Sequence, residues 1–232
     1  MGQYYFPIFL SANGGKTLCS FYSHDYDNGL KLLEHSWMGN RFVNSVVAKG
    51  LSLLKPFTIV WLGDYAELDE DVLPLKDHRA FDPANNKGGI GRDYVRMFNK
   101  ARKVYEGSLY RVGPDDEGIR EYLKYAEDAV FYDTVTHQKL SLRKYAANAE
   151  AMQEASGKEY PGEWIVHPLP LLTCLGNGKG GGDYRNGHDM EWVGAWALHP
   201  IAILPESAGL PDPDGEWEDI SEKVWFEEDL TY

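Results

Sequence analysis

Residues 176–185 are the part of the sequence best suited to binding an anion. They read Gly-Asn-Gly-Lys-Gly-Gly-Gly-Asp-Tyr-Arg. Glycine lacks a Cβ, so such a run can aim several backbone N–H groups at one phosphate, and Lys179 and Arg185 add positive charge. We therefore predict that a small phosphorylated, nucleotide-like ligand contacts Gly178, Lys179, Gly180, Gly181, Gly182, Asp183, Tyr184 and Arg185. The competing explanation is a surface loop without a ligand.

The same segment formally contains a GxGxxG pattern, at Gly176, Gly178 and Gly181. A dinucleotide-binding fold also needs a helix that begins directly after the pattern, and the sequence of residues 183–187 does not begin one. We therefore predict neither that fold nor a resident cofactor. A divalent metal is the one cofactor that the sequence leaves open.

Histidines beside carboxylates form clusters in three places: His24-Asp25 with Asp27, Glu34-His35, and His188-Asp189 close to Asp183. Such groups bind divalent metals and carry out general acid–base catalysis, so His24, Asp25, His188 and Asp189 are the catalytic candidates. The calcium-loop spacing, HExxH and the GxSxG nucleophile elbow are all missing. Capping or surface hydrogen bonding is the competing explanation, because the chain has seven histidines and 36 acids.

A second candidate anion site lies on a predicted helix over residues 93–105. Arg92, Arg96 and Lys100 recur at helical spacing and share one side of it. Guanidinium groups bind phosphate in a bidentate manner, so this side suits a phosphate or an acidic partner. The competing explanation is a solvated helix face.

The negative charge of the chain is concentrated near its C-terminus. The formal net charge is −13, and residues 205–232 hold ten acids against Lys223 alone, which is −9. This balance argues against unaided binding to nucleic acid or to an anionic membrane. The same residues include Trp217, Trp225 and Phe226, which favours a segment docked on the body of the protein. A surface that binds a partner, or mimics a nucleic acid, is the alternative.

The pattern of apolar residues predicts an α+β fold with a mixed or antiparallel sheet, an N-terminal β-hairpin and several amphipathic helices. Residues 1–204 are predicted to form one domain, followed by the acidic segment 205–232. The expected strands are 3–10, 17–22, 57–62, 130–135, 140–142, 164–166, 169–175, 192–196 and 201–204. The expected helices are 30–36, 41–54, 93–105, 119–128 and 145–155. Asp27 or Asn28 is expected to cap the first helix and Asn40 the second, and Pro7 favours an edge position for the first strand.

The sequence predicts a cytoplasmic protein. Cys19 and Cys174 have neither disulfide-framework nor zinc spacing. No apolar run approaches the roughly 18 residues that span a bilayer, and the N-terminus lacks the features of a signal peptide.

Several segments resemble a family of small proteins encoded by bacteria, phages and other mobile elements. The matching words are Met-Gly-Gln-Tyr-Tyr at the start, residues 27–37, residues 61–65, His-Pro-Leu-Pro-Leu-Leu-Thr at 167–173, and residues 176–184. The resemblance implies no activity and assigns no catalytic residue. It implies a phage or mobile-element setting, in which small acidic proteins often inhibit host defences.

Three functional hypotheses result. The leading one is a non-enzymatic accessory protein that holds a small phosphorylated ligand at residues 176–185. The second is a counter-defence inhibitor that binds a host protein through its acidic surface. The third is a metal-dependent hydrolase that uses His24, Asp25, Asp183, His188 or Asp189.

Overall fold

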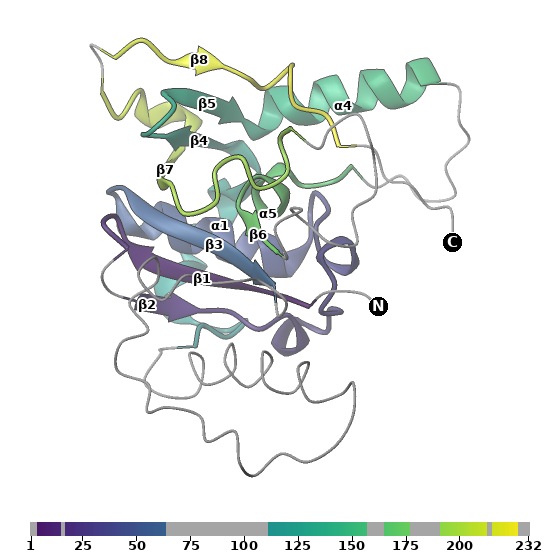
Figure 1. Cartoon of the computed structure of the whole chain (residues 1–232). Helices are drawn as coiled ribbons and strands as arrows, with labels where there is room; N and C mark the ends of the chain where they lie inside the picture. Colours follow the sequence, from purple (N-terminus) through teal and green to yellow (C-terminus); the bar gives the residue numbers. More distant parts are fainter. Residues whose placement is uncertain are drawn as a thin grey trace, which may run out of the picture.

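The computed structural model describes residues 4–14, 17–63, 111–156, 165–176, 191–212 and 215–226. Its strands are β1 (Tyr5–Ser11), β2 (Thr17–Ser20), β3 (Phe57–Gly63), β4 (Ala129–Asp133), β5 (Gln138–Ser141), β6 (Cys174–Leu175), β7 (Pro200–Pro205) and β8 (Glu218–Asp219). They form one mixed sheet in the order β2-β1-β3-β7-β4-β5-β8, and β6 pairs with β3 beside that path. Figure 1 shows β1, β2 and β3 together in one part of the sheet and β4, β5 and β8 in the other. The predicted α+β class, with a mixed sheet and an N-terminal β-hairpin, is confirmed.

Strand β1 is an inner strand rather than the predicted edge strand. It pairs antiparallel with β2 on one side and with the whole of β3 on the other. Pro7 opposes Trp61, whose N–H donates to Thr173 O at 3.0 Å and therefore points away from β1. The missing N–H of proline thus leaves the ladder between β1 and β3 intact. Both faces of β1 and of β3 are buried, as the apolar run on each strand predicts.

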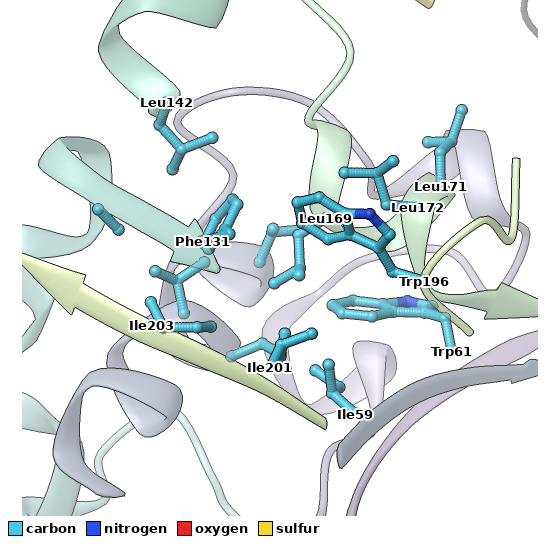
Figure 2. Packing of buried hydrophobic residues seen from close by; sticks show 14 of the residues in the cluster. Ile59, Trp61, Phe131, Leu142, Leu169, Leu171, Leu172, Trp196, Ile201 and Ile203 are labelled. Atoms are coloured by element: carbon cyan, nitrogen blue, oxygen red, sulfur yellow. The ribbon is translucent and has the colours of Figure 1, made fainter. Parts of the chain in front are cut away.

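The second edge of β3 is shared by two strands, an arrangement that we call the β3 fork. Strand β7 pairs antiparallel with Phe57 and Thr58, and β6 pairs parallel with Trp61 and Leu62. Hydrophobic side chains from all three strands meet there. Figure 2 shows Ile59 and Trp61 of β3 with Ile201 of β7, in one core cluster with Leu172 and Trp196.

The predicted hairpin in the middle of the chain is formed by β4 and β5, with its turn at residues 134–137 rather than 136–139. Strand β4 also pairs antiparallel with β7, and β8 adds to β5 in parallel. The chain after β8 contributes Ile220, Val224 and Phe226 to the main core. The C-terminal residues of the described chain are therefore part of both the sheet and the core.

The helices of the described chain cover this sheet. They are α1 (Arg41–Leu53), α3 (Glu117–Arg120), α4 (Leu142–Ser156) and α5 (Pro168–Leu172), with 3-10 turns η1 (Ser23–Tyr26), η2 (Leu32–Glu34), η4 (Leu123–Asp128) and η5 (Glu206–Ala208). Asn40 caps α1 as predicted, because its side chain accepts from the N–H groups of Phe42 and Val43 at 2.8 and 3.3 Å. A Cβ at Gly50 would lie 2.5 Å from Ile203 Cδ1, so glycine lets α1 approach β7 closely.

Three local predictions are wrong. Asp27 does not cap a helix start; it ends η1 with φ 57°, and the predicted helix 30–36 is the 3-10 turn η2. Most of residues 169–175, predicted as a strand, form α5, because Pro168 suits the first turn of a helix and the His167 side chain accepts from Leu169 N–H. Residues 192–196, also predicted as a strand, form turns. The predicted helix 93–105 lies outside the described residues.

No helix in the described ranges combines the length and the apolar character that crossing a membrane requires.

Candidate functional site

The glycine-rich segment begins at the carboxyl ends of two neighbouring parallel strands. The described chain stops at Gly176, directly after β6, and resumes at Glu191. Strand β6 pairs parallel with the last part of β3, with Trp61 opposite Cys174 and Leu62 opposite Leu175. In open α/β sheets ligands bind outside the carboxyl ends of the strands, and this short parallel pair provides the same local arrangement.

The chain that follows the segment is fixed to the chain that precedes it by two backbone hydrogen bonds. Gly194 N–H donates to Leu171 O at 2.7 Å, and Trp196 N–H donates to Leu172 O at 2.8 Å. We call these four residues the segment clamp. Gly194 has φ +75°, and a Cβ there would lie 2.8 Å from Cys174 O, so only glycine allows this close approach.

Trp196 anchors the segment clamp in the core. Its side chain is fully buried and lies among the hydrophobic residues drawn in Figure 2. Its Nε1–H donates to Gln138 Oε1 at 3.2 Å. Leu171 and Leu172 are also fully buried. The described chain on either side of residues 177–190 is therefore held by core residues from α5 and from the turns after residue 191.

All eight residues predicted to bind a ligand lie outside the described residues. These are Gly178, Lys179, Gly180, Gly181, Gly182, Asp183, Tyr184 and Arg185, together with His188 and Asp189 of the third hypothesis. The predicted anion-binding residues Arg92, Arg96 and Lys100 also lie outside.

The predicted pair His24-Asp25 is described, and its carboxylate is engaged by an arginine. Both oxygens of Asp25 accept from Arg111, from Nε and from Nη2, in a bidentate ion pair. The guanidinium also lies over the ring of Tyr22, 4.6 Å from its centroid, and His24 is exposed beside the same ring. Arg111 thus competes for both Asp25 oxygens with any metal or substrate proton. Among the residues that the structure describes, no group of three or more His, Cys, Asp and Glu side chains could hold a metal.

A carboxylate–imidazole pair that sequence reasoning missed lies at the end of β4. Asp133 is fully buried, and its carboxylate accepts from Val135 N–H at 2.9 Å, from Thr136 Oγ1 at 2.6 Å and from His199 Nδ1 at 2.8 Å. The His199 side chain is 29% exposed. The two residues are far apart in sequence, and neither belongs to a local motif, so no signal in the sequence pairs them. A carboxylate that orients an imidazole is the arrangement that activates histidine in catalysis.

Two further histidines are buried in the core and have no access to solvent. His35 Nε2 accepts from Trp61 Nε1–H at 3.0 Å, and its Nδ1 lies 3.2 Å from Gly29 O, so the neutral tautomer protonated on Nδ1 fits both contacts. Burial lowers the pKa of His35 to about 4, against the opposing effect of the Gly29 carbonyl. Burial lowers the pKa of His167 to about 3, and among the described residues its Nε2 has no hydrogen-bond partner.

Part of the acidic C-terminal charge is paired with basic side chains of the described chain. Asp219 contacts Lys144 at 2.8 Å, Glu218 contacts Lys223 at 2.5 Å, and Glu206 lies 3.4 Å from Arg143. Hydrogen bonding and charge from Lys223 lower the pKa of Glu218. These exposed pairs are weak, but they reduce the negative field that a basic partner would meet.

No family model matches the chain, and neither does any curated protein or any solved structure. No relative therefore transfers a role to these residues.

Proposed function

We propose that the protein is a cytoplasmic accessory protein of a phage or mobile element and that it binds a small phosphorylated, nucleotide-like ligand through residues 178–185. The observation that carries the proposal is the segment clamp, which fixes to the core the chain on either side of residues 177–190, the stretch that contains the proposed ligand-binding residues. The glycines allow backbone N–H groups to surround a phosphate, and Lys179 and Arg185 supply positive charge.

The segment clamp supports binding for an energetic reason. Ordering a loop around a ligand costs conformational entropy, and part of that cost comes from bringing the loop ends together. Here Gly194 and Trp196 already hold the ends against Leu171 and Leu172. The origin of the segment at the carboxyl ends of β3 and β6 adds a second argument, because binding loops favour that edge.

A thermal-shift panel tests the proposal. Inorganic phosphate, pyrophosphate and nucleoside mono-, di- and triphosphates are each added to the full chain. A ligand at about 100 times its Kd stabilises the folded state by about 2.7 kcal/mol, which raises the Tm by roughly 5–10 °C for a chain of this size. Lys179→Ala and Arg185→Ala should reduce that rise.

Lys55→Ala is the matched control. Lys55 is exposed and precedes β3, at the opposite end of that strand from β6, so the variant removes one positive charge without touching the proposed site. The proposal is wrong if no compound raises the Tm and native mass spectrometry of the purified protein finds no bound ligand.

The two other hypotheses have less support from the described residues. An inhibitor that binds a host defence protein through its acidic surface would use acids of which Glu206, Glu218 and Asp219 are already paired within the chain. A metal-dependent hydrolase at Asp25 would have to displace Arg111 from both carboxylate oxygens.

A further inference from the structure

The hydrogen bond between Asp133 and His199 is not required to stabilise the turn after β4. Asp133 already stabilises the turn after β4 through Val135 N–H and Thr136 Oγ1, without His199. The imidazole is an additional partner that comes from the chain just before β7. It is partly exposed, whereas the carboxylate behind it is fully buried.

The contact with Asp133 leaves the outer nitrogen of His199 available. Nδ1 lies 2.8 Å from the carboxylate, so the neutral ring carries its proton there and keeps the Nε2 lone pair. Within the described part of the chain, no hydrogen-bond partner contacts Nε2. The other two hydrogen bonds prevent the carboxylate from rotating, which fixes the direction of the ring.

We propose that His199 is a catalytic nucleophile for acyl transfer and that Asp133 is its positioning residue. The Nε2 lone pair attacks the carbonyl carbon of an activated ester, the bond from that carbon to the leaving oxygen breaks, and the leaving group departs with the electron pair. The acyl-imidazolium keeps its proton on Nδ1 against Asp133. Water then attacks the acyl carbon and the bond from that carbon to Nε2 breaks, which releases the carboxylic acid and restores the neutral imidazole, while the remaining proton of the water passes through solvent to the departed oxyanion.

The buried carboxylate behind the ring selects the class of substrate. Asp133 lies 2.8 Å from Nδ1 of His199 and is fully buried, so solvent screens its negative charge little. That charge repels anionic phosphoryl donors, so a neutral acyl ester is the favoured substrate.

The test uses the full chain with p-nitrophenyl acetate, and follows both nitrophenolate release and acetyl adducts by mass spectrometry. We expect an acetyl group on His199. His199→Gln, whose amide can still donate to Asp133, should lower release to the buffer background. Asp133→Asn should slow acylation about tenfold or more, as loss of an orienting carboxylate does.

Two variants separate catalysis from a structural role. Thr136→Val removes one of the two other hydrogen bonds to the Asp133 carboxylate and leaves its contact with the imidazole in place, so it should slow acylation less than Asp133→Asn does. His137→Gln removes an exposed histidine of the same turn and should leave acylation unchanged. Proton NMR should show the Nδ1 proton in the native chain and in Thr136→Val, and no such signal in Asp133→Asn.

The proposal is overturned if the acetyl group resides on His24 or His137, if folded His199→Gln reacts like the native chain, or if Thr136→Val slows acylation as much as Asp133→Asn. None of these outcomes depends on whether residues 178–185 bind a ligand.

Discussion

His35 and His167 are imidazoles that the fold keeps neutral. His35 meets a donor on Nε2 and an acceptor on Nδ1, so one neutral tautomer satisfies both and an added proton would face Trp61 Nε1–H. His167 accepts from Leu169 N–H at the start of α5, and burial alone lowers its pKa. These two side chains contribute packing and capping at neutral pH, and they make the fold sensitive to acid.

Stability should therefore fall between pH 6.5 and about 4. An unfolded histidine takes up its proton near pH 6.5, whereas the folded pKa of His35 is about 4 and that of His167 about 3. As pH falls through this window the unfolded chain gains two protons that the folded chain does not, so the free energy of unfolding decreases. The slope from both groups is roughly 2–3 kcal/mol per pH unit near pH 5. Urea unfolding at pH 7, 6 and 5 measures it.

Two variants test whether the buried histidines cause this pH dependence: His35→Gln is the test and His24→Gln is its control. His35→Gln removes one of the two buried imidazoles and should reduce the slope by about half, whatever its effect on stability at pH 7. His24 is exposed, and its replacement should leave the slope unchanged. Equal slopes in the native chain and in His35→Gln would show that the acid sensitivity has another origin.

At the scale of elements, the segment clamp depends on the close approach of Gly194 to β6. Gly194→Ala should destabilise the fold, because the residue combines φ +75° with a Cβ position 2.8 Å from the backbone oxygen of Cys174. Positive φ alone costs an alanine roughly 1–2 kcal/mol, and the backbone contact adds to that cost.

Gly39→Ala is the control for Gly194→Ala. Gly39 has φ +80°, but a Cβ there would have no atom within 4 Å. The difference in the free energy of unfolding between the two variants, measured in urea, therefore isolates the contact with Cys174. If the two variants lose the same stability, the close approach at the segment clamp has no energetic importance.

Local signals in the sequence predicted the elements whose formation depends on residues that are close together in the sequence. The first hairpin, α1 with its Asn40 cap, β3 and β7 follow from apolar pattern, turn residues and capping. The apolar run at 169–175 misled the prediction. Pro168 and Pro170 argued only against a central position in the sheet, whereas proline also suits the first turn of a helix, which is where they lie. Strand β8 has two residues and forms only against β5, so no local signal could predict it.

The candidate site residues likewise include some that local sequence indicates and some that it does not. Glycine and lysine composition alone indicated residues 176–185, because that prediction needs only neighbours in the sequence. The pairing of Asp133 with His199 depends on β4 lying against β7, and a single sequence does not reveal which strands become neighbours. The contact between Asp25 and Arg111 is equally non-local.

At the scale of the whole molecule, the acidic C-terminal residues are also structural residues. Ile220, Val224 and Phe226 belong to the main core, β8 covers the edge of β5, and Trp217 packs on Tyr132 of β4. Acid content by itself does not reveal this, because the same residues would suit a solvated partner-binding tail.

Truncation after Pro205 should therefore prevent cooperative folding. Burial of three large apolar side chains contributes roughly 5–9 kcal/mol, which is comparable to the total stability of a typical domain. Circular dichroism with urea unfolding of the truncated chain measures the loss. Glu216→Lys and Glu222→Lys are the controls, because both acids are exposed and reversing their charge should change stability by less than about 0.5 kcal/mol. A truncated chain that unfolds cooperatively, with native stability, would contradict the prediction.

The β3 fork has a consequence for how the chain is made. Strand β3 completes its pairing with β1 early in synthesis, but the partners of its other edge, at Cys174 and at Pro200, leave the ribosome much later. Until then the nascent chain carries an apolar strand with an open edge, which is the form most prone to pair with another molecule. Such late, long-range closure also slows folding. We therefore expect the nascent chain to be prone to aggregation through the open edge of β3 until the second half of the chain has emerged.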